Sequence, residues 1–154
     1  MAPDASDWVE LVDGDLSVAA ADTWVRRPGA GAVVTFSGLV RDVSDGRDEP
    51  VTALEYETHE PLALARMRQV VAEIRRRWPD VAAVAMLHRL GRAEVSDPVV
   101  VVSVSSPHRA EAFAAAQFGI DALKVSVPLY KRDIWSTGAA WSATTQDAVD
   151  VPHG

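Results

Sequence analysis

Hydrophobic and polar residues alternate along the first part of the chain in blocks that predict three strands and a helix. The pattern at residues 8–12 predicts a short strand, and residues 17–26 follow with the period of a helix that Ser17 caps. Residues 31–41 and 51–58 are rich in apolar side chains and flank a polar loop, which predicts two further strands. Because these two strands are consecutive, we expect them to pair as a long hairpin.

A second helix is predicted from Pro61 to the Trp78-Pro79 step, since proline is favoured in the first turn of a helix and ends one further on. Its apolar residues recur at helical spacing and are expected to face the core: Leu62, Met67, Val70, Val71 and Ile74. Residues 81–89 and 99–105 are predicted to be strands joined by a turn. The second of these is nearly all valine, which indicates burial on both faces.

Ser106 and Pro107 are expected to open a third helix, with the serine as cap and the proline at the first helical position. Its core-facing stripe is predicted to consist of Phe113, Ala116, Ile120 and Leu123, up to a stop before Pro128. Extended structure is expected at residues 127–135, and Trp141 is assigned to a last short strand or arm.

The order of these elements, β-α-β-β-α-β-β-α-β, predicts an α+β fold. The consecutive strands imply a mixed, mainly antiparallel sheet with about three helices. A length of 154 residues, 48% of them hydrophobic, suits one domain with its own core. We place this domain at residues 1–141 and interpret the patternless residues 142–154 as a flexible tail.

The composition narrows the possible functions. The chain has no cysteine, which removes disulfides, thiolate metal ligands and any thiol that could carry sulfur. Its net charge of -7 disfavours nucleic acid as the main partner, because phosphate backbones bind basic surfaces. Neither a leader peptide nor an apolar run of about 18 residues is evident, so a cytoplasmic protein is expected.

Lys124 and Lys131 are the only lysines among 15 lysine and arginine residues. A primary amine retained in an arginine-rich chain indicates chemistry that arginine cannot perform, since a desolvated amine can lose its proton. The alternative is two ordinary surface lysines. A turn at Pro128 could bring both ammonium groups to one pocket, where their repulsion would lower both pKa values.

The start of the third predicted helix is a candidate anion site. Free backbone N–H groups and the helix dipole favour negative charge there, and His108 and Arg109 would add charged donors. Arg41, at the end of a predicted strand, could reach the same site. The alternative is that His108 packs in the first turn and both arginines are solvated. No spacing of histidines suggests a metal site, and no phosphate loop or dinucleotide fingerprint is present, so no metal or cofactor is expected.

Five segments, taken in order, resemble the large, catalytic subunit of molybdopterin synthase: GAVVTFSGLVRD, LEYETHEPLA, LHRLG, SSPHRAEAF and DALKVSVPLYKRD. The resemblance extends from Gly31 to Trp141. It implies a single-domain, hammerhead-like α+β subunit that forms a homodimer within a heterotetramer. It also implies a partner, a small ubiquitin-like sulfur carrier whose C-terminal Gly-Gly ends in a thiocarboxylate.

The implied reaction transfers sulfur from this carrier to cyclic pyranopterin monophosphate in two rounds and forms the dithiolene of molybdopterin, for molybdenum cofactor biosynthesis. By position, Lys124 would lie beside the carrier's terminal carbonyl, and Lys131 would assist proton transfer or stabilise charge. The substrate-binding residues that the resemblance implies are Arg41, His108 and Arg109 for the pterin and its phosphate, and Phe36 and Ile120 for the lining of the pocket.

One departure from the family concerns the region after Trp141. Some relatives carry an arginine there that reaches across the dimer, whereas residues 142–146 of this chain contain no basic residue. One other function stays open. A non-catalytic dimeric module could hold a ubiquitin-like tail or a small anion in the same cleft. An unrelated acetyl or phosphoryl transferase would need a phosphate loop or a cofactor fingerprint, and the sequence has neither.

Overall fold

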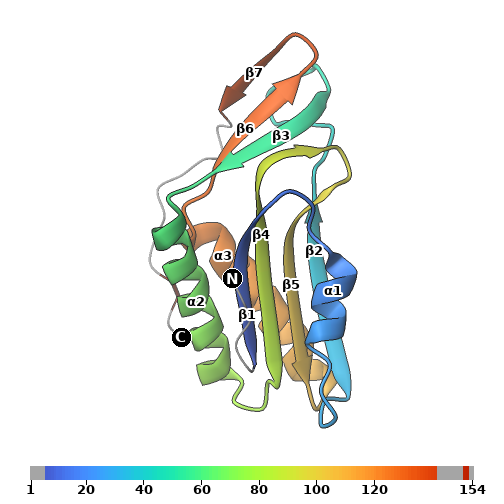
Figure 1. The fold of residues 1–154 in the computed structure, drawn as a ribbon, viewed down its shortest axis with the longest axis vertical. Helices are drawn as coiled ribbons and strands as arrows, with labels where there is room; N and C mark the ends of the chain where they lie inside the picture. The colour runs from blue at the N-terminus through green and yellow to red at the C-terminus, as the bar shows by residue number, and fades with distance from the viewer. Residues whose placement is uncertain (1–5, 142–150, 153–154) are drawn as a thin grey trace.

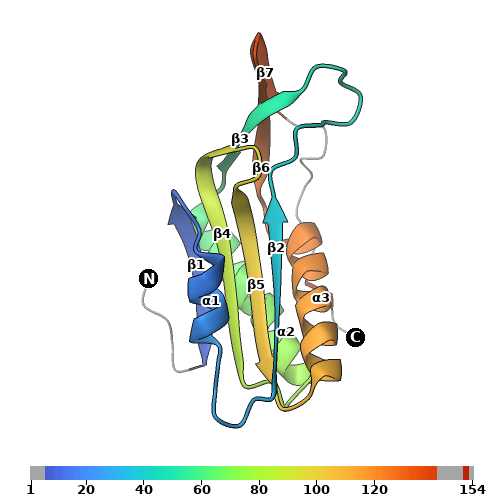
Figure 2. The same cartoon turned by 90° about the vertical axis from the view of Figure 1, so that its right-hand side faces the viewer.

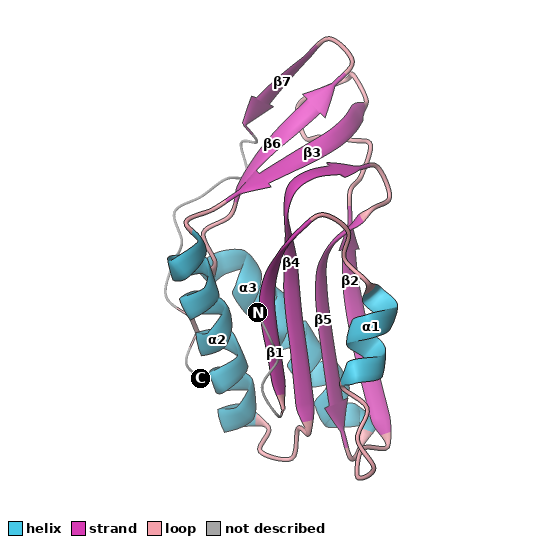
Figure 3. Ribbon diagram, in the orientation of Figure 1, coloured by secondary structure: helices cyan, strands magenta, loops and turns pink. Residues whose placement is uncertain are grey.

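The computed structural model describes residues 6–141 and 151–152 (Figures 1 and 3). Its elements confirm the α+β class, and every strand and helix predicted from the sequence is present. The elements in chain order are β1 (Asp7–Asp13), α1 (Val18–Trp24), β2 (Ala32–Leu39), β3 (Val51–Glu57), α2 (Glu60–Arg77), β4 (Ala83–Glu94), β5 (Pro98–Ser106), α3 (Arg109–Ser126), β6 (Tyr130–Trp135) and β7 (Gly138–Trp141).

Four strands form the main sheet, in the order β2-β5-β4-β1. β5 pairs antiparallel with β2 and β4, whereas β1 pairs parallel with β4, so the sheet is mixed and mainly antiparallel as predicted. α2 and α3 cover one face of this sheet, and α1 covers the other (Figure 2). The larger core cluster, which includes Met67, Ile74, Met86 and Val102, lies between the sheet and the two long helices. Burial of this apolar surface is what holds the helices in place.

β4 leaves the main sheet and continues into a smaller one. Its residues 83–88 pair with β5, and its residues 91–94 pair with β3, which continues to β6 and β7. Between the two parts, Gly91 has a φ of +80°, in the left-handed region that favours glycine. The strand therefore bends here, and the smaller sheet forms a head that projects from the body (Figure 1).

The predicted hairpin between residues 31–41 and 51–58 is wrong. β2 pairs with β5 in the main sheet, and β3 pairs with β4 and β6 in the smaller sheet. The physical reason is burial. β5 is buried along almost its whole length, so it is stable as a central strand, and β2 supplies the pairing on its second edge.

Two apolar side chains that were assigned to the core are exposed instead. Leu62 is 43% exposed and Phe113 is 63% exposed. In α3 the face on the sheet is made largely of small residues, Ala112, Ala115, Ala116 and Gly119. A Cβ atom added at Gly119 would lie 3.1 Å from Cγ1 of Val102, so the helix lies very close to the sheet. The large Phe113 side chain falls on the outer side of this closely packed helix.

α3 also begins later than predicted. Its N-cap is His108, whose side chain makes no capping hydrogen bond, and the helix starts at Arg109. Ser106 belongs to the end of β5, where its hydroxyl is buried without a hydrogen-bond partner. Pro107 therefore precedes the helix. Its carbonyl oxygen lies 2.6 Å from where a Cβ of Gly31 would be, so only glycine fits opposite it.

Two residues near the C-terminus return to the body. Val151 is 3% exposed and packs in the larger core cluster, and Arg77 of α2 donates a hydrogen bond of 3.3 Å to the carbonyl oxygen of Pro152. The remainder of the predicted tail, residues 142–150 and 153–154, lies outside the described residues. Within the described part of the chain, no helix is long and apolar enough to span a membrane.

Candidate functional site

Lys124, Lys131 and Arg41 come together where the body meets the smaller sheet. Lys124 lies in the last turn of α3, Lys131 near the start of β6, and Arg41 just beyond the end of β2. These parts of the three elements reach the same end of the main sheet (Figures 1 and 2). The charges of Lys131 and Arg41 both act on Lys124. The fold thus assembles three of the predicted site residues from separate elements.

Lys124 is chemically distinct from an ordinary surface lysine. Its pKa is lowered, chiefly because its ammonium group loses hydration, and further by repulsion from Lys131 and then from Arg41. The residue nevertheless remains exposed, so a ligand can reach it. An amine of this kind exchanges its proton more readily than a free lysine, which suits proton transfer to and from a bound substrate.

Tyr56 lies directly across from Lys131 in the pairing of β3 with β6. Cross-strand partners project from the same face of a sheet, so the two side chains start next to one another. Burial, and secondarily the charge of Asp133, raise the pKa of Tyr56 to about 12. The phenol therefore keeps its proton at neutral pH and can donate a hydrogen bond beside Lys131.

His88 lies next to Tyr56, at the end of the part of β4 that pairs with β5. It is 4% exposed, and its ring contacts that of Tyr56 edge to face, with 4.8 Å between the centroids. Burial lowers the pKa of His88 to about 4, against a hydrogen bond to the carbonyl of Arg89 that acts in the opposite direction. The charge of Lys124 lowers it further. The ring is therefore neutral at physiological pH.

Sequence reasoning did not single out Tyr56 or His88. Both lie inside segments that carried the family resemblance, LEYETHEPLA and LHRLG. The signal that could have found His88 is its place at the end of the otherwise apolar run AVAMLH, because a buried histidine in a strand needs a polar partner. Tyr56 has no comparable signal, since an aromatic residue in a strand is common.

Phe36 and Ile120 lie on the same side of the main sheet as α3. Phe36 is the cross-strand partner of Val102, which belongs to the core cluster that also contains Ile120. Ile120 is 8% exposed and lies one helical turn before Lys124, so it supports the lysine from within the core. Phe36 is 36% exposed and leaves part of its ring open to a ligand.

His108 and Arg109 are not brought to the lysines within one chain. They lie at the opposite end of α3 from Lys124, about 22 Å away at the usual helical rise of about 1.5 Å per residue. Both side chains are exposed. The expectation that Arg41 reaches the same site as His108 and Arg109 is therefore wrong within one copy of the chain, because β2 ends where α3 ends rather than where it begins.

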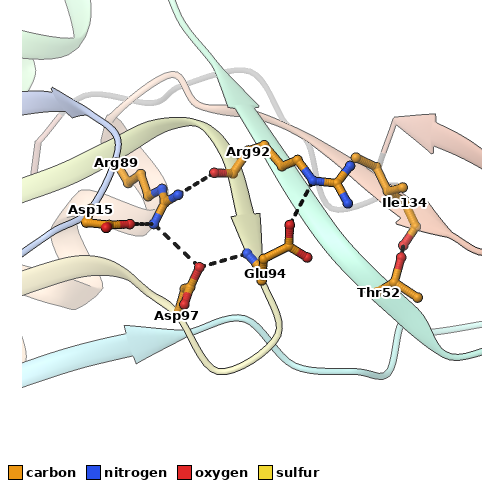
Figure 4. A network of polar contacts seen from close by, with 7 residues as sticks. All are labelled: Asp15, Thr52, Arg89, Arg92, Glu94, Asp97 and Ile134. Atoms are coloured by element: carbon orange, nitrogen blue, oxygen red, sulfur yellow. Dashed lines mark hydrogen bonds and ion pairs between the residues drawn. The ribbon is translucent and has the colours of Figure 1, made fainter.

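A buried arginine fixes the bend of β4 close to the site (Figure 4). Arg89 is 8% exposed and forms ion pairs of 3.1 Å with Asp15 and 3.6 Å with Asp97. It also donates a hydrogen bond of 2.5 Å to the carbonyl oxygen of Arg92, beyond the bend. These contacts tie β4 to the loops that follow β1 and β4, so the orientation of the smaller sheet is set by a buried charge with several partners.

The chemistry that the site can perform follows from its charges. Three cations face one region and a neutral phenol donor lies beside them, an arrangement that binds anions and stabilises negative charge as it develops. Among the described residues, no group of three histidine, aspartate or glutamate side chains is placed to hold a metal ion. The three cations and the phenol suit the described part of the site to acid–base chemistry on an anionic substrate.

Known proteins resemble this chain in sequence and in fold. The family model described as "MoaE protein" matches residues 11–126. A molybdopterin synthase catalytic subunit from a Nostoc species is 46% identical over 110 residues, which cover 71% of this chain and 66% of that relative. The solved structure of molybdopterin synthase from Staphylococcus aureus is 33% identical, with a TM-score of 0.80 over 87% of this chain and 96% of that one.

A second solved structure shares the fold alone. The complex of subunits 1 and 2 of molybdopterin-converting factor from Helicobacter pylori has a TM-score of 0.74 and 18% identity, over 92% of this chain and 94% of that chain. The matching family model, the similar catalytic subunit and the shared fold together show that this chain belongs to the MoaE family, that of the molybdopterin synthase catalytic subunits.

Proposed function

We propose that this chain transfers sulfur to cyclic pyranopterin monophosphate as the catalytic subunit of a cytoplasmic molybdopterin synthase. Family membership supports the reaction. The observation that carries the site is the convergence of Lys124, Lys131 and Arg41 at one end of the main sheet. A thiocarboxylate and a cyclic phosphate are both anions, so they match a site of three cations.

In this proposal Lys124 lies beside the terminal carbonyl of the sulfur donor and Lys131 assists it. The thiocarboxylate sulfur forms a bond to a pterin carbon and displaces an oxygen substituent from it. Water then cleaves the bond between this sulfur and the carrier's carbonyl carbon, so the sulfur stays on the pterin and the carrier leaves with an ordinary carboxylate. The lowered pKa of Lys124 supports a role in moving the protons of these steps. Arg41 would hold the phosphate, because a guanidinium offers paired donors to a phosphate group.

The partner that we propose is a small ubiquitin-like carrier that ends in a Gly-Gly thiocarboxylate. The absence of cysteine from this chain supports an external source of sulfur. The Helicobacter pylori protein with the same fold was solved as a complex of two subunits, which supports a second protein in the assembly.

A second copy of the chain completes the site in this proposal. His108 and Arg109 lie at the far end of α3 from Lys124, so they can contact the same pterin only if another copy presents them. Both side chains are exposed and follow the end of β5, which leaves them available to a neighbouring subunit. A twofold dimer in which the start of each α3 lies against the other subunit's lysines would complete both sites, since such an interface is self-complementary.

The test is conversion of cyclic pyranopterin monophosphate to molybdopterin by the purified chain with thiocarboxylated carrier. We expect Lys124→Ala and Lys131→Ala each to lower the rate by at least about 100-fold, the usual contribution of a positioned acid or base. Arg68→Ala, which removes an exposed cation of α2 outside the cluster, serves as the matched control and should keep full activity. Full activity of both lysine variants would refute their roles.

The alternative is a non-catalytic module that holds a ubiquitin-like tail. It is distinguished in the same assay, because a wild-type chain that binds the carrier tightly yet forms no molybdopterin would favour binding over catalysis. The lowered pKa of Lys124 favours the enzyme, since simple retention of an anionic tail is best served by lysines that keep their protons.

A further inference from the structure

The hydrogen bond of His88 determines which nitrogen of its ring carries the proton. Nδ1 lies 2.8 Å from the carbonyl oxygen of Arg89, and a carbonyl oxygen can only accept a hydrogen bond. Nδ1 therefore carries the proton, and in the neutral ring Nε2 can only accept. The residue is 4% exposed, so this tautomer is held inside the protein rather than averaged by solvent.

The ring contact with Tyr56 joins His88 to the strand that carries Lys131. The two rings meet at 80°, the edge-to-face geometry that aromatic pairs favour. Tyr56 has Gly91 as its cross-strand partner on one side and Lys131 on the other. Tyr56 thus joins His88, through the ring contact, to its strand partner Lys131 on β6.

The groups around the ring are almost all hydrogen-bond donors. Lys124 of α3 acts on His88 by its charge, and Tyr56 of β3 packs against it. Lys131 of β6 and Arg41 act on Lys124 in turn, and the carboxylate of Asp133 acts on Tyr56. Ammonium and guanidinium groups offer no acceptor. Nε2 of a neutral His88 supplies one.

From these contacts we infer that His88 is a positioning residue of the sulfur-transfer site. Its ring holds Tyr56 in place, which in turn fixes the position of Lys131, and its Nε2 is a hydrogen-bond acceptor for the ammonium of Lys124. A neutral ring is suited to this role, because a protonated one would add a fourth cation to the cluster. The inference rests on the proposed function for the identity of the reaction, whereas its test follows the lysines themselves.

Both lysines can be titrated directly, since the chain has only two. Protein made with ¹³C-labelled lysine gives one side-chain signal for each, and Lys124→Arg and Lys131→Arg assign them. The matched variants are His88→Asn, whose amide reaches the position of Nδ1, and His88→Gln, whose amide reaches that of Nε2. Thermal unfolding of each variant confirms that the protein folds before it is titrated.

We expect His88→Asn to lower the pKa of Lys124 below that of the wild type, because loss of an acceptor disfavours the ammonium form. His88→Gln should keep the wild-type titration, because its side-chain oxygen can replace Nε2. In the sulfur-transfer assay, His88→Asn should lower kcat by about tenfold with an unchanged KM, the size expected for one lost hydrogen bond to a charged group. Identical lysine titrations in the two folded variants would overturn the inference and leave His88 with a packing role only.

A second pair of variants keeps the inference testable if His88→Asn does not fold. Tyr56→Phe retains the ring against His88, and Tyr56→Ala removes it. We expect the titrations of Tyr56→Phe to match the wild type, and the pKa of Lys124 to rise in Tyr56→Ala as Lys131 moves away. Equal titrations in both would overturn the positioning of Lys131. Failure of the wild-type chain with thiocarboxylated carrier to form molybdopterin would refute the proposed function, whatever the titrations show.

Discussion

Burial changes the protonation of single residues at two adjacent places in this protein. It lowers the pKa of Lys124 at the end of α3 and that of His88 beneath it. The two effects serve different ends, since a lysine with a lowered pKa can exchange protons, whereas a histidine with a pKa of about 4 stays neutral as an acceptor. Burial thus makes the proton of Lys124 easier to exchange and keeps the ring of His88 neutral.

His88 should make stability depend on pH. Its pKa falls from 6.5 to about 4 on folding, so below pH 6.5 the unfolded chain takes up a proton that the folded chain refuses. The contribution of the neutral His88 ring to the free energy of unfolding is therefore complete above pH 6.5. It is lost as the pH falls towards 4, and the total loss is about 3 kcal/mol. Urea unfolding at neutral and acidic pH measures it.

The variant His88→Gln serves as the control for this dependence. Glutamine has no proton to gain in this range, so its free energy of unfolding should fall less steeply between pH 6.5 and pH 4 than that of the wild type. Equal slopes for the two proteins would show that other groups cause the acid sensitivity.

At the scale of elements, α3 carries the site because it lies so close to the sheet. Small residues along its inner face let the helix approach until a Cβ at Gly119 would lie 3.1 Å from Val102 and 3.3 Å from Ile74. The same approach places Lys124, at the end of the helix, over the junction of the two sheets. Close packing of this helix against the sheet therefore positions a functional side chain at its end.

Gly119→Val should destabilise the protein by about 1–3 kcal/mol, the usual cost of adding volume to a packed core. Gln117→Val is the matched control, because it introduces the same side chain two residues away on the exposed face of α3. Its cost should stay below about 0.7 kcal/mol, from helix propensity alone. Chemical denaturation measures both, and similar losses would contradict a tight contact at Gly119.

At the scale of the whole molecule, the described chain contains two separated groups of site residues. Lys124, Lys131 and Arg41 lie at one end of α3, and His108 and Arg109 lie at the other. A single copy cannot offer both groups to one small substrate, because an α-helix of this length is rigid. The proposed dimer resolves this separation by contributing one group from each subunit.

Mixing two inactive variants tests that arrangement. Lys124→Ala protein mixed with His108→Ala/Arg109→Ala protein should recover about a quarter of the wild-type rate, since half of the randomly assembled dimers contain one intact site out of two. Each variant alone should remain inactive. If subunit exchange is verified and the mixture still recovers no activity, the contribution of a second copy is refuted.

The sequence by itself determined the kind of each element and most of the chemistry. Apolar periodicity identified the three helices and the strands, because that pattern reflects which face each element buries. Lys124 and Lys131 stood out by residue type alone, and ordered motifs indicated the family. All of these signals are local, so they can be read without knowing which segments meet.

Only the tertiary structure decided how the elements meet. The partners of β2 and β3 are distant in sequence, and their choice depends on which apolar faces can be buried together. The same long-range packing exposes Phe113, neutralises His88 and separates His108 from Lys124. Burial, strand order and the direction of a helix are properties of the whole chain, which no local pattern contains.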